Sequence, residues 1–101
     1  MKTIDELTGL IELWGAQKGI LPDPDAMKQG LKTLEEVTEL LSAIEDGDEY
    51  EVADAIGDIY VTLVMQTYAW GLTIEDCVAQ AYHTINQRTG TMVNGVFIKD
   101  V

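Results

Sequence analysis

The sequence predicts an all-α fold, a four-helix bundle that ends in a short β-hairpin. Apolar residues recur at three- and four-residue spacing through most of the chain, which is the period of an amphipathic helix. Clusters of Gly, Pro and Asp interrupt this pattern at residues 19–25 and 46–48. Near the end, Asn94 and Gly95 stand between two short β-prone runs, a pattern typical of a tight hairpin. A chain of 101 residues, 47% of them hydrophobic, suffices for one small core, so we expect residues 1–101 to form a single domain.

The first two helices are predicted over about residues 3–17 and 24–45. The first is indicated by an apolar face with helical spacing, made by Ile4, Leu7, Leu10, Ile11 and Trp14. The segment between the helices contains Gly19, Pro22 and Pro24 and is expected to be a loop. We expect Asp23 to cap the second helix, with Pro24 at its first helical position.

The third and fourth helices follow after the Asp-Gly-Asp break. The third is predicted over about residues 49–70, with Gly71 as a left-handed residue that ends it. Thr73 is expected to cap the fourth helix, with Asp76 three residues later as an imperfect capping box. The fourth helix should continue to about Arg88.

Net charge excludes some classes of partner. Eighteen acidic residues oppose six basic ones, for a formal net charge of -12. A basic surface for nucleic acid is therefore absent, and anionic membrane surfaces are disfavoured. No apolar run reaches the ~18 residues that a membrane-spanning helix needs, and no leader segment is recognisable. A single cysteine, Cys77, permits no disulfide within the chain, so we expect a cytoplasmic protein in a reducing compartment.

Carboxylates at helical spacing indicate a metal site. Glu36 and Glu39 lie one turn apart on the second helix, and Asp54 and Asp58 lie one turn apart on the third. The short connection at 46–48 makes these helices antiparallel neighbours, so the four carboxylates should reach similar height in a groove. Asp54 and Asp58 share their stripe with core-type residues, and we expect both on the inner face. A hard divalent cation, by default Mg²⁺, would relieve the repulsion among the four charges.

Other interpretations of the acidic residues stay open. Glutamates at this spacing are common on solvated helix surfaces, so an acidic helical interaction module is the alternative to an enzyme. Glu35 points about a quarter turn away from Glu36 and is either part of the site or a plain surface residue. Glu51 continues the acidic stripe one turn earlier, although an acid near a helix start is also favoured by the helix dipole.

These residues resemble a known family. Lys32, Glu35, Glu36 and Glu39 form K-x-x-E-E-x-x-E, and the sequence D-A-I-G-D follows across the turn at 54–58. Together they look like the motifs of the MazG-like group of all-α nucleoside triphosphate pyrophosphohydrolases, which are related to dimeric dUTPases. The tail I-N-Q-R-T-G-T-M-V-N-G-V-F-I-K is similar to the ending of small MazG-like proteins, many of them phage-encoded. The resemblance covers about residues 10–101.

The resemblance implies an activity and a ligand set. Such enzymes hydrolyse a nucleoside triphosphate at the α-phosphorus to the monophosphate and pyrophosphate, with Mg²⁺ or, in its place, Mn²⁺. The family's metal ligands fall on Glu36, Glu39 and Asp58. The fourth position falls on Ala55, so the sequence departs from the pattern, and either Asp54 or Glu51 can take that role. A homologue that binds nucleotide without hydrolysing it is therefore also compatible with the sequence.

Four further residues are candidates for substrate binding. Lys32 lies one turn before Glu36 and either binds phosphate or balances the acids. Asn86 and Arg88 stand at the end of the fourth helix, a region that the family uses for phosphates. Trp14 is expected to pack in the core; because the family's first helix helps to form the base pocket, stacking on a nucleobase is the alternative.

The third helix predicts an assembly of several chains. Its apolar residues cover more than one stripe, so most of its sides must be buried. One short chain cannot bury them all, and a two-stranded hairpin is marginal by itself. We therefore expect a homodimer or a homotetramer, as the resemblance also implies.

Overall fold

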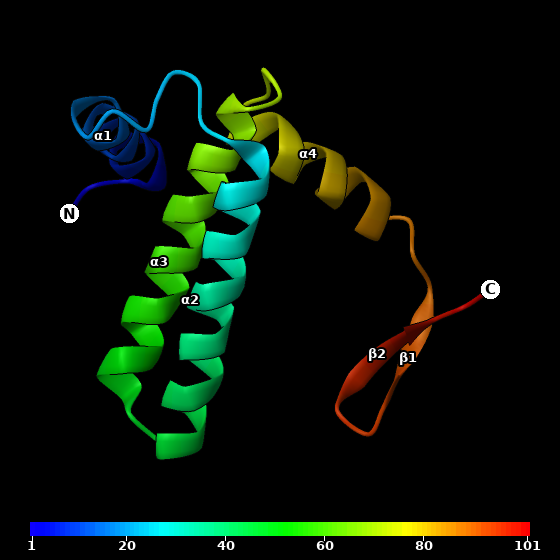
Figure 1. Ribbon diagram of the computed structural model, residues 1–101. Helices are drawn as coiled ribbons and strands as arrows, with labels where there is room; N and C mark the ends of the chain where they lie inside the picture. Colours follow the sequence, from blue (N-terminus) through cyan, green and yellow to red (C-terminus); the bar gives the residue numbers. More distant parts are fainter.

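The computed structural model describes residues 1–101 and contains four helices and one hairpin. The helices are α1 (Ile4–Gln17), α2 (Ala26–Asp46), α3 (Glu49–Tyr68) and α4 (Ile74–Ile85). They are followed by strands β1 (Gly90–Val93) and β2 (Val96–Lys99). In Figure 1, α2 and α3 form a long antiparallel pair, α1 lies beside the upper part of α3, and α4 leads away to the hairpin. The predicted all-α class with a C-terminal hairpin is confirmed.

Side-chain caps fix where three of the helices begin. Thr3 and Glu6 form a full capping box at the start of α1, where the threonine hydroxyl accepts from the Glu6 N–H at 3.1 Å. Asp48 caps α3 by accepting from the Glu51 N–H, also at 3.1 Å. Thr73 caps α4 as predicted, and accepts from the Asp76 N–H. These bonds satisfy N–H groups that have no partner inside the helix.

The predicted start of α2 is wrong by two residues. Asp25, and not Asp23, is the cap, and its carboxylate accepts from the Lys28 N–H at 2.9 Å. The physical reason is tertiary: the Gln66 side-chain amide donates to the Ala26 carbonyl at 3.0 Å and so attaches the first turn of α2 to α3. Pro24 therefore precedes the helix and does not open it.

Gly71 is the left-handed residue after α3, as predicted, although the last helical residue is Tyr68 and not Trp70. Gly71 has a φ of 65°, which is left-handed and favours glycine. This bend lets the Leu72 N–H donate back to the Thr67 carbonyl at 3.0 Å.

The C-terminal hairpin has the predicted turn. Asn94 and Gly95 both have positive φ, 50° and 79°, as a type I′ turn requires. The strands are antiparallel, and Gly90 pairs with Lys99 at the open end. The hairpin packs against none of the helices. Its apolar side chains, Met92, Val93, Val96, Phe97 and Ile98, are all exposed in the single chain.

The buried core is small and lies where α1 meets α3. Leu21, Val64 and Met65 form it, and side chains such as Ile11 and Ile20 pack around them. Gly15 makes this approach possible, because a Cβ on this residue would lie 2.7 Å from the Met65 sulfur. None of the helices has the features of a membrane span.

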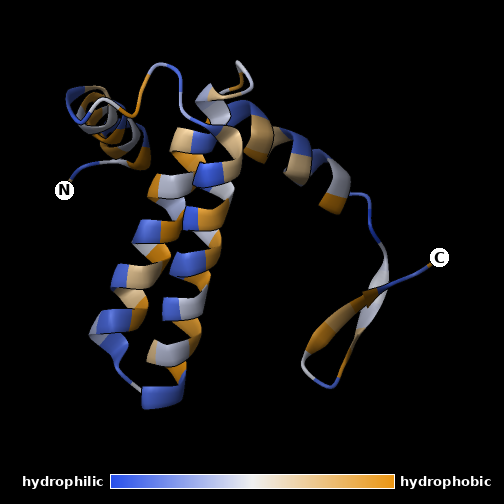
Figure 2. Cartoon of the chain, in the orientation of Figure 1, coloured by the Kyte–Doolittle hydropathy of each residue, from blue (hydrophilic) through white to orange (hydrophobic).

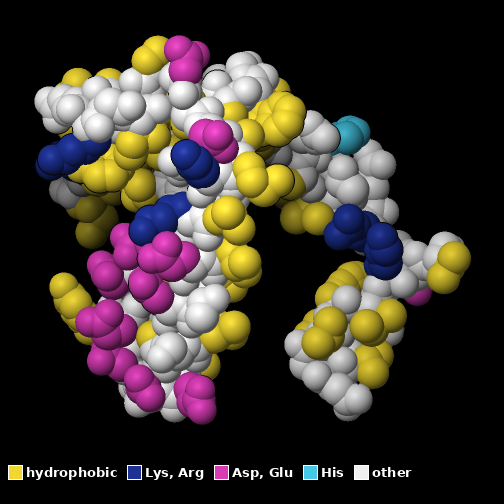
Figure 3. Space-filling model, viewed as in Figure 1, with side chains coloured by type: hydrophobic (Ala, Val, Ile, Leu, Met, Phe, Trp, Pro, Cys, Tyr) yellow, Lys and Arg dark blue, Asp and Glu magenta, His cyan; other side chains and the backbone are white.

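The apolar stripe of α2 points away from this core. Met27, Leu31, Leu34, Leu41 and Ile44 recur at helical spacing, and each is more than half exposed. Apolar residues also gather along the flank of the α2–α3 pair that faces α4 (Figures 2 and 3). The acidic residues occupy the opposite flank (Figure 3). Exposed apolar surface of this extent is typical of an interaction site, so the predicted four-helix bundle is not complete within one chain.

The two glycines of α1 give a matched test of its packing. Gly15→Ala should lower the free energy of unfolding by about 1–3 kcal/mol, because the new methyl group overlaps Met65 and Leu21. Gly9→Ala should raise it by up to about 1 kcal/mol, because nothing lies within 4 Å of that position and alanine favours the helix. Urea unfolding followed by circular dichroism measures both. Equal effects of the two substitutions would contradict this packing of α1.

Candidate metal centre and substrate cavity

Three glutamates of α2 form the centre of the acidic site. Glu35, Glu36 and Glu39 each present a carboxylate oxygen, and these oxygens lie within 4.8 Å of one another. Their helical spacing brings them together, since residues three and four apart are neighbours on a helix. Glu36 faces the α2–α3 interface and is 8% exposed, whereas Glu35 and Glu39 are open to solvent. The structure therefore places Glu35 beside the predicted pair.

The Glu36 carboxylate is buried without adequate compensation. Its Oε2 atom has no hydrogen-bond partner. Burial raises the pKa of Glu36, and the nearby carboxylates of Glu39 and Asp58 raise it further, while Lys32 acts in the opposite direction. A buried carboxylate oxygen that lacks a partner is costly, so this atom is available to a ligand that enters the groove.

Asp58 faces the same groove from α3. It is half-buried, and its pKa is raised by burial and then by the carboxylates of Asp54 and Glu39. Asp54, which was also expected on the inner face, is exposed, although its carboxylate lies close enough to Asp58 to raise the pKa of that residue. Ala55 occupies the position that packs inward and is 4% exposed. Both Ala55 and Asp54 precede Asp58 by about one turn, and Asp54 lies on the more exposed side.

Lys32 is the one cation that pairs with these acids. Its ammonium lies 3.3 Å from Glu35 Oε1 and 3.9 Å from Glu36 Oε1. The hydrogen bond to Glu35 is the main cause of the raised pKa of Lys32, so this side chain stays charged. One positive charge against five carboxylates leaves the groove strongly negative, which favours cations.

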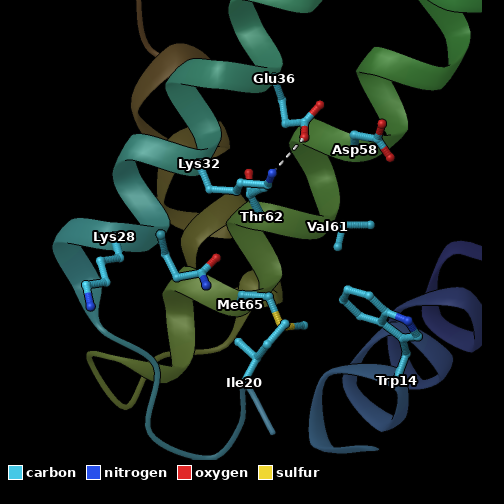
Figure 4. Close-up of a pocket in the computed structure, with 10 residues that line it drawn as sticks. Trp14, Ile20, Lys28, Lys32, Glu36, Asp58, Val61, Thr62 and Met65 are labelled. Carbon is cyan, nitrogen blue, oxygen red and sulfur yellow. Dashed lines mark ion pairs between the residues drawn. The ribbon is translucent and has the colours of Figure 1, made fainter. Parts of the chain in front are cut away.

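A cavity of about 340 Å³ adjoins the acids. Figure 4 shows Glu36 and Asp58 near Lys32 at one end, and Trp14 with Ile20 at the other. Trp14 is 43% exposed, so the prediction that it packs in the core is wrong; it forms a wall of the cavity because α1 rests on α3 alone. The cavity thus joins a charged end to an apolar end.

The cavity also contains residues that the sequence did not single out. They are Ile20, Lys28, Gln29, Val61, Thr62 and Met65. Lys28 lies one turn before Lys32, and Thr62 one turn after Asp58, so extending each stripe by a turn would have found both. Thr62 is engaged structurally, because its hydroxyl donates to the Ile59 carbonyl and accepts from Thr33 at 2.8 Å.

Asn86 and Arg88 are not part of this groove in the single chain. Asn86 caps the end of α4, where its side chain accepts from the Tyr82 hydroxyl at 3.5 Å. Arg88 makes no ion pair and lines a separate hollow with residues of α4. Both lie at the end of α4 that points away from the α2–α3 pair (Figure 1).

The fold and site define an all-α protein with an acidic groove suited to a divalent cation, next to a cavity that has a charged end and an apolar end. A family model of the MazG nucleotide pyrophosphohydrolase domain matches residues 24–93. The chain therefore belongs to the MazG nucleotide pyrophosphohydrolase family. This match contains the acidic residues of α2 and α3, and the resemblance seen in the sequence is confirmed.

One relative comes from a phage. An uncharacterized 18.2 kDa protein in the rep-hol intergenic region of Haemophilus phage HP1 (strain HP1c1) is 31% identical over 65 residues. The alignment covers 64% of this chain and 40% of the relative, so the chain spans about two-fifths of that protein's length. No solved structure matches the chain.

Burial of Glu36 predicts a pH-dependent stability of the metal-free protein. A raised pKa means that the folded state binds this proton more tightly than the unfolded state. The contribution of Glu36 to the free energy of unfolding therefore falls as pH rises above its ordinary value of 4.5 through the raised pKa. Glu36→Gln should stabilise the metal-free protein at pH 7, and this gain should shrink toward pH 4.

Thermal unfolding in the presence of a chelator at several pH values measures this effect. Glu45→Gln is the control, because Glu45 is exposed on the same helix and its substitution removes the same one negative charge. A gain at pH 7 that is no larger for Glu36→Gln than for the control would contradict the assignment of a costly buried carboxylate.

Proposed function

We propose that this protein hydrolyses a nucleoside triphosphate to the monophosphate and pyrophosphate with the help of a bound divalent cation. The observation that carries the proposal is the buried Glu36 carboxylate, whose Oε2 lacks a partner, at the point where the acidic groove meets the cavity. Family membership supports the reaction class. The cavity supports a substrate with an organic end and an anionic end, as a nucleotide has.

The donor set fits a hard cation such as Mg²⁺, for which Mn²⁺ can substitute. Carboxylate oxygens are the ligands that these ions prefer. Glu36, Glu39 and Asp58 would hold the cation, and Asp54 would be the fourth ligand because its carboxylate lies close enough to raise the pKa of Asp58. When bound, such an ion neutralises charge on phosphate oxygens and lowers the pKa of a water molecule.

The chain's other residues would position the reactants. Glu35 is near the three-glutamate centre and open to solvent, so it can orient the attacking water or accept its proton. Lys32 and Lys28 line the cavity and can contact phosphate oxygens, while Trp14 can stack on the base. The water oxygen bonds to the α-phosphorus as the bond to the bridging oxygen breaks, and pyrophosphate leaves.

Ala55 supports a second candidate, a homologue that binds the nucleotide without hydrolysing it. This residue is 4% exposed at the position where the family places a fourth acidic ligand. If Asp54 does not reach the cation from the solvent side, the centre has one ligand fewer. Nucleotide binding without release of pyrophosphate would distinguish this candidate from the enzyme.

We also propose that the functional unit is a homodimer or a homotetramer. The exposed apolar stripe of α2 and the apolar side chains of the hairpin support this proposal, because both would be stabilised by a covering surface. A second copy can supply that surface symmetrically. Asn86 and Arg88 would then bind phosphate in the groove of a neighbouring copy.

Removal of the Asp58 charge tests the metal site. Asp58→Asn should lower pyrophosphate release by at least about 100-fold while the fold stays intact, because a ligand is lost without a change of shape. A screen of ribo-, deoxyribo- and modified triphosphates with Mg²⁺ or Mn²⁺ supplies the assay. Near-normal turnover in this variant would refute the assignment.

Two further variants serve as controls for the fourth ligand. Asp54→Ala should lower turnover much more than Glu51→Ala, because Asp54, unlike Glu51, is among the residues that shift the pKa of Asp58. Glu51 lies nearer the α2–α3 turn, in a hollow with Asp46 and Asp48. The reverse ranking would move the site toward that turn.

The mass in solution tests the assembly. Light scattering at micromolar concentration should give two or four times the chain mass of 11.1 kDa. Leu34→Glu with Leu41→Glu should lower the mass, because both side chains lie on the exposed stripe of α2. A folded, active species with the mass of one chain would overturn this proposal.

A further inference from the structure

The α1 helix forms one wall of the cavity and is held by α3 alone. Among the helices, α1 packs only against α3 and does not reach α2. Few apolar side chains hold it there: Ile11 packs on the core, and Gly15 lies against Met65. Apolar contact is non-directional and does not by itself fix how a helix is rotated or shifted on its neighbour.

Two hydrogen-bonded pairs join α1 to α3, and hydrogen bonds, unlike apolar contacts, are directional. The Thr8 side chain is 3% exposed, and its hydroxyl lies 2.6 Å from the Tyr60 hydroxyl. Thr8 donates its own proton to the Ile4 carbonyl at 2.8 Å, so Tyr60 is the donor in this pair. One turn further along α1, the Tyr68 hydroxyl donates to the Glu12 carboxylate. This bond is the main cause of the raised pKa of Tyr68.

The pairs and the cavity wall lie on different stripes of the same helices. Thr8, Glu12 and Gly15 follow one face of α1, and Tyr60 and Tyr68 lie two turns apart on α3. The neighbouring stripe of α1 carries Leu7, Leu10 and Trp14, which line a second cavity of about 330 Å³ with Asp58 and Val61. Trp14, Asp58 and Val61 line both cavities.

We propose that the Thr8–Tyr60 and Glu12–Tyr68 pairs are positioning contacts that fix α1 on α3 and thereby keep Trp14 in the wall of the cavity that Glu36 and Asp58 also line. Rotation of α1 by one residue would turn Trp14 by ~100° and remove it from the cavity. Tyr60, Tyr68, Thr8 and Glu12 themselves do not line this cavity. The inference rests on the proposed function where it concerns the base of a nucleotide, whereas the placement of Trp14 is independent of it.

The fluorescence of Trp14 tests the placement without any substrate. In a Trp70→Phe background, Trp14 is the only tryptophan, and acrylamide quenching reports its accessibility. Tyr60→Phe and Tyr68→Phe keep the rings and remove the hydroxyls, and together they should increase the quenching. Tyr50→Phe is the matched control, because Tyr50 is 77% exposed and makes no hydrogen bond through its side chain. Unchanged quenching in a folded double variant overturns the proposal.

Kinetics separates positioning from a general loss of stability. The double tyrosine variant should raise KM by about tenfold with kcat within about threefold of wild type, because binding of the base is weakened equally before and during reaction. Glu12→Gln keeps an acceptor for Tyr68 and should retain the wild-type KM, whereas Glu12→Leu should not. A lower Tm with unchanged KM would contradict the inference. Increased quenching in a protein that hydrolyses none of the tested triphosphates would support the positioning and refute the proposed function.

Discussion

The carboxylate of Glu36 inside the α2–α3 interface is the constraint on which the rest of the structure depends. With this residue turned toward α3, the opposite side of α2, ~160° away, carries Leu34. The usual arrangement of a surface helix is thus inverted: the glutamate is 8% exposed and the leucine 61%. The buried carboxylate and the exposed leucine are both costly in a single chain, and the proposed cation and second copy would relieve these two costs.

The existence and order of the helices could be predicted because they depend on local chemistry. Apolar periodicity, the Thr73 cap and the Asn94–Gly95 turn act within a few residues and were read correctly. The start of α2 could not be placed, because two nearby aspartates are equally good caps in isolation. The bond from Gln66 to the Ala26 carbonyl joins residues 40 apart and attaches the observed first turn to α3, and no local pattern reports it.

The site residues likewise divide into those grouped by local helical spacing and those placed by contacts between helices. Glu35, Glu36 and Glu39 are neighbours on one helix, so their grouping follows from the helical repeat alone. Trp14 was expected in the core because an apolar face predicts burial, but the same apolar face also suits the wall of an open cavity. Asp54 was placed one step too far inward, since the sequence does not say which residue of α3 meets α2. The Glu12–Tyr68 bond has no sequence signal, because neither residue is unusual for its own helix.

The separate attachment of α1 has a consequence for how this protein can diverge. The acids lie on α2 and α3, and the exposed apolar stripe lies on α2. Trp14 lies on α1, which packs on α3 and does not contact α2. Substitutions along α1 can therefore reshape the organic end of the cavity while the charged end and the apolar surface remain as they are. If the proposed function holds, selection can act on which molecule is accepted independently of the proposed assembly and cation site, so related proteins could share one reaction and differ in what they act on.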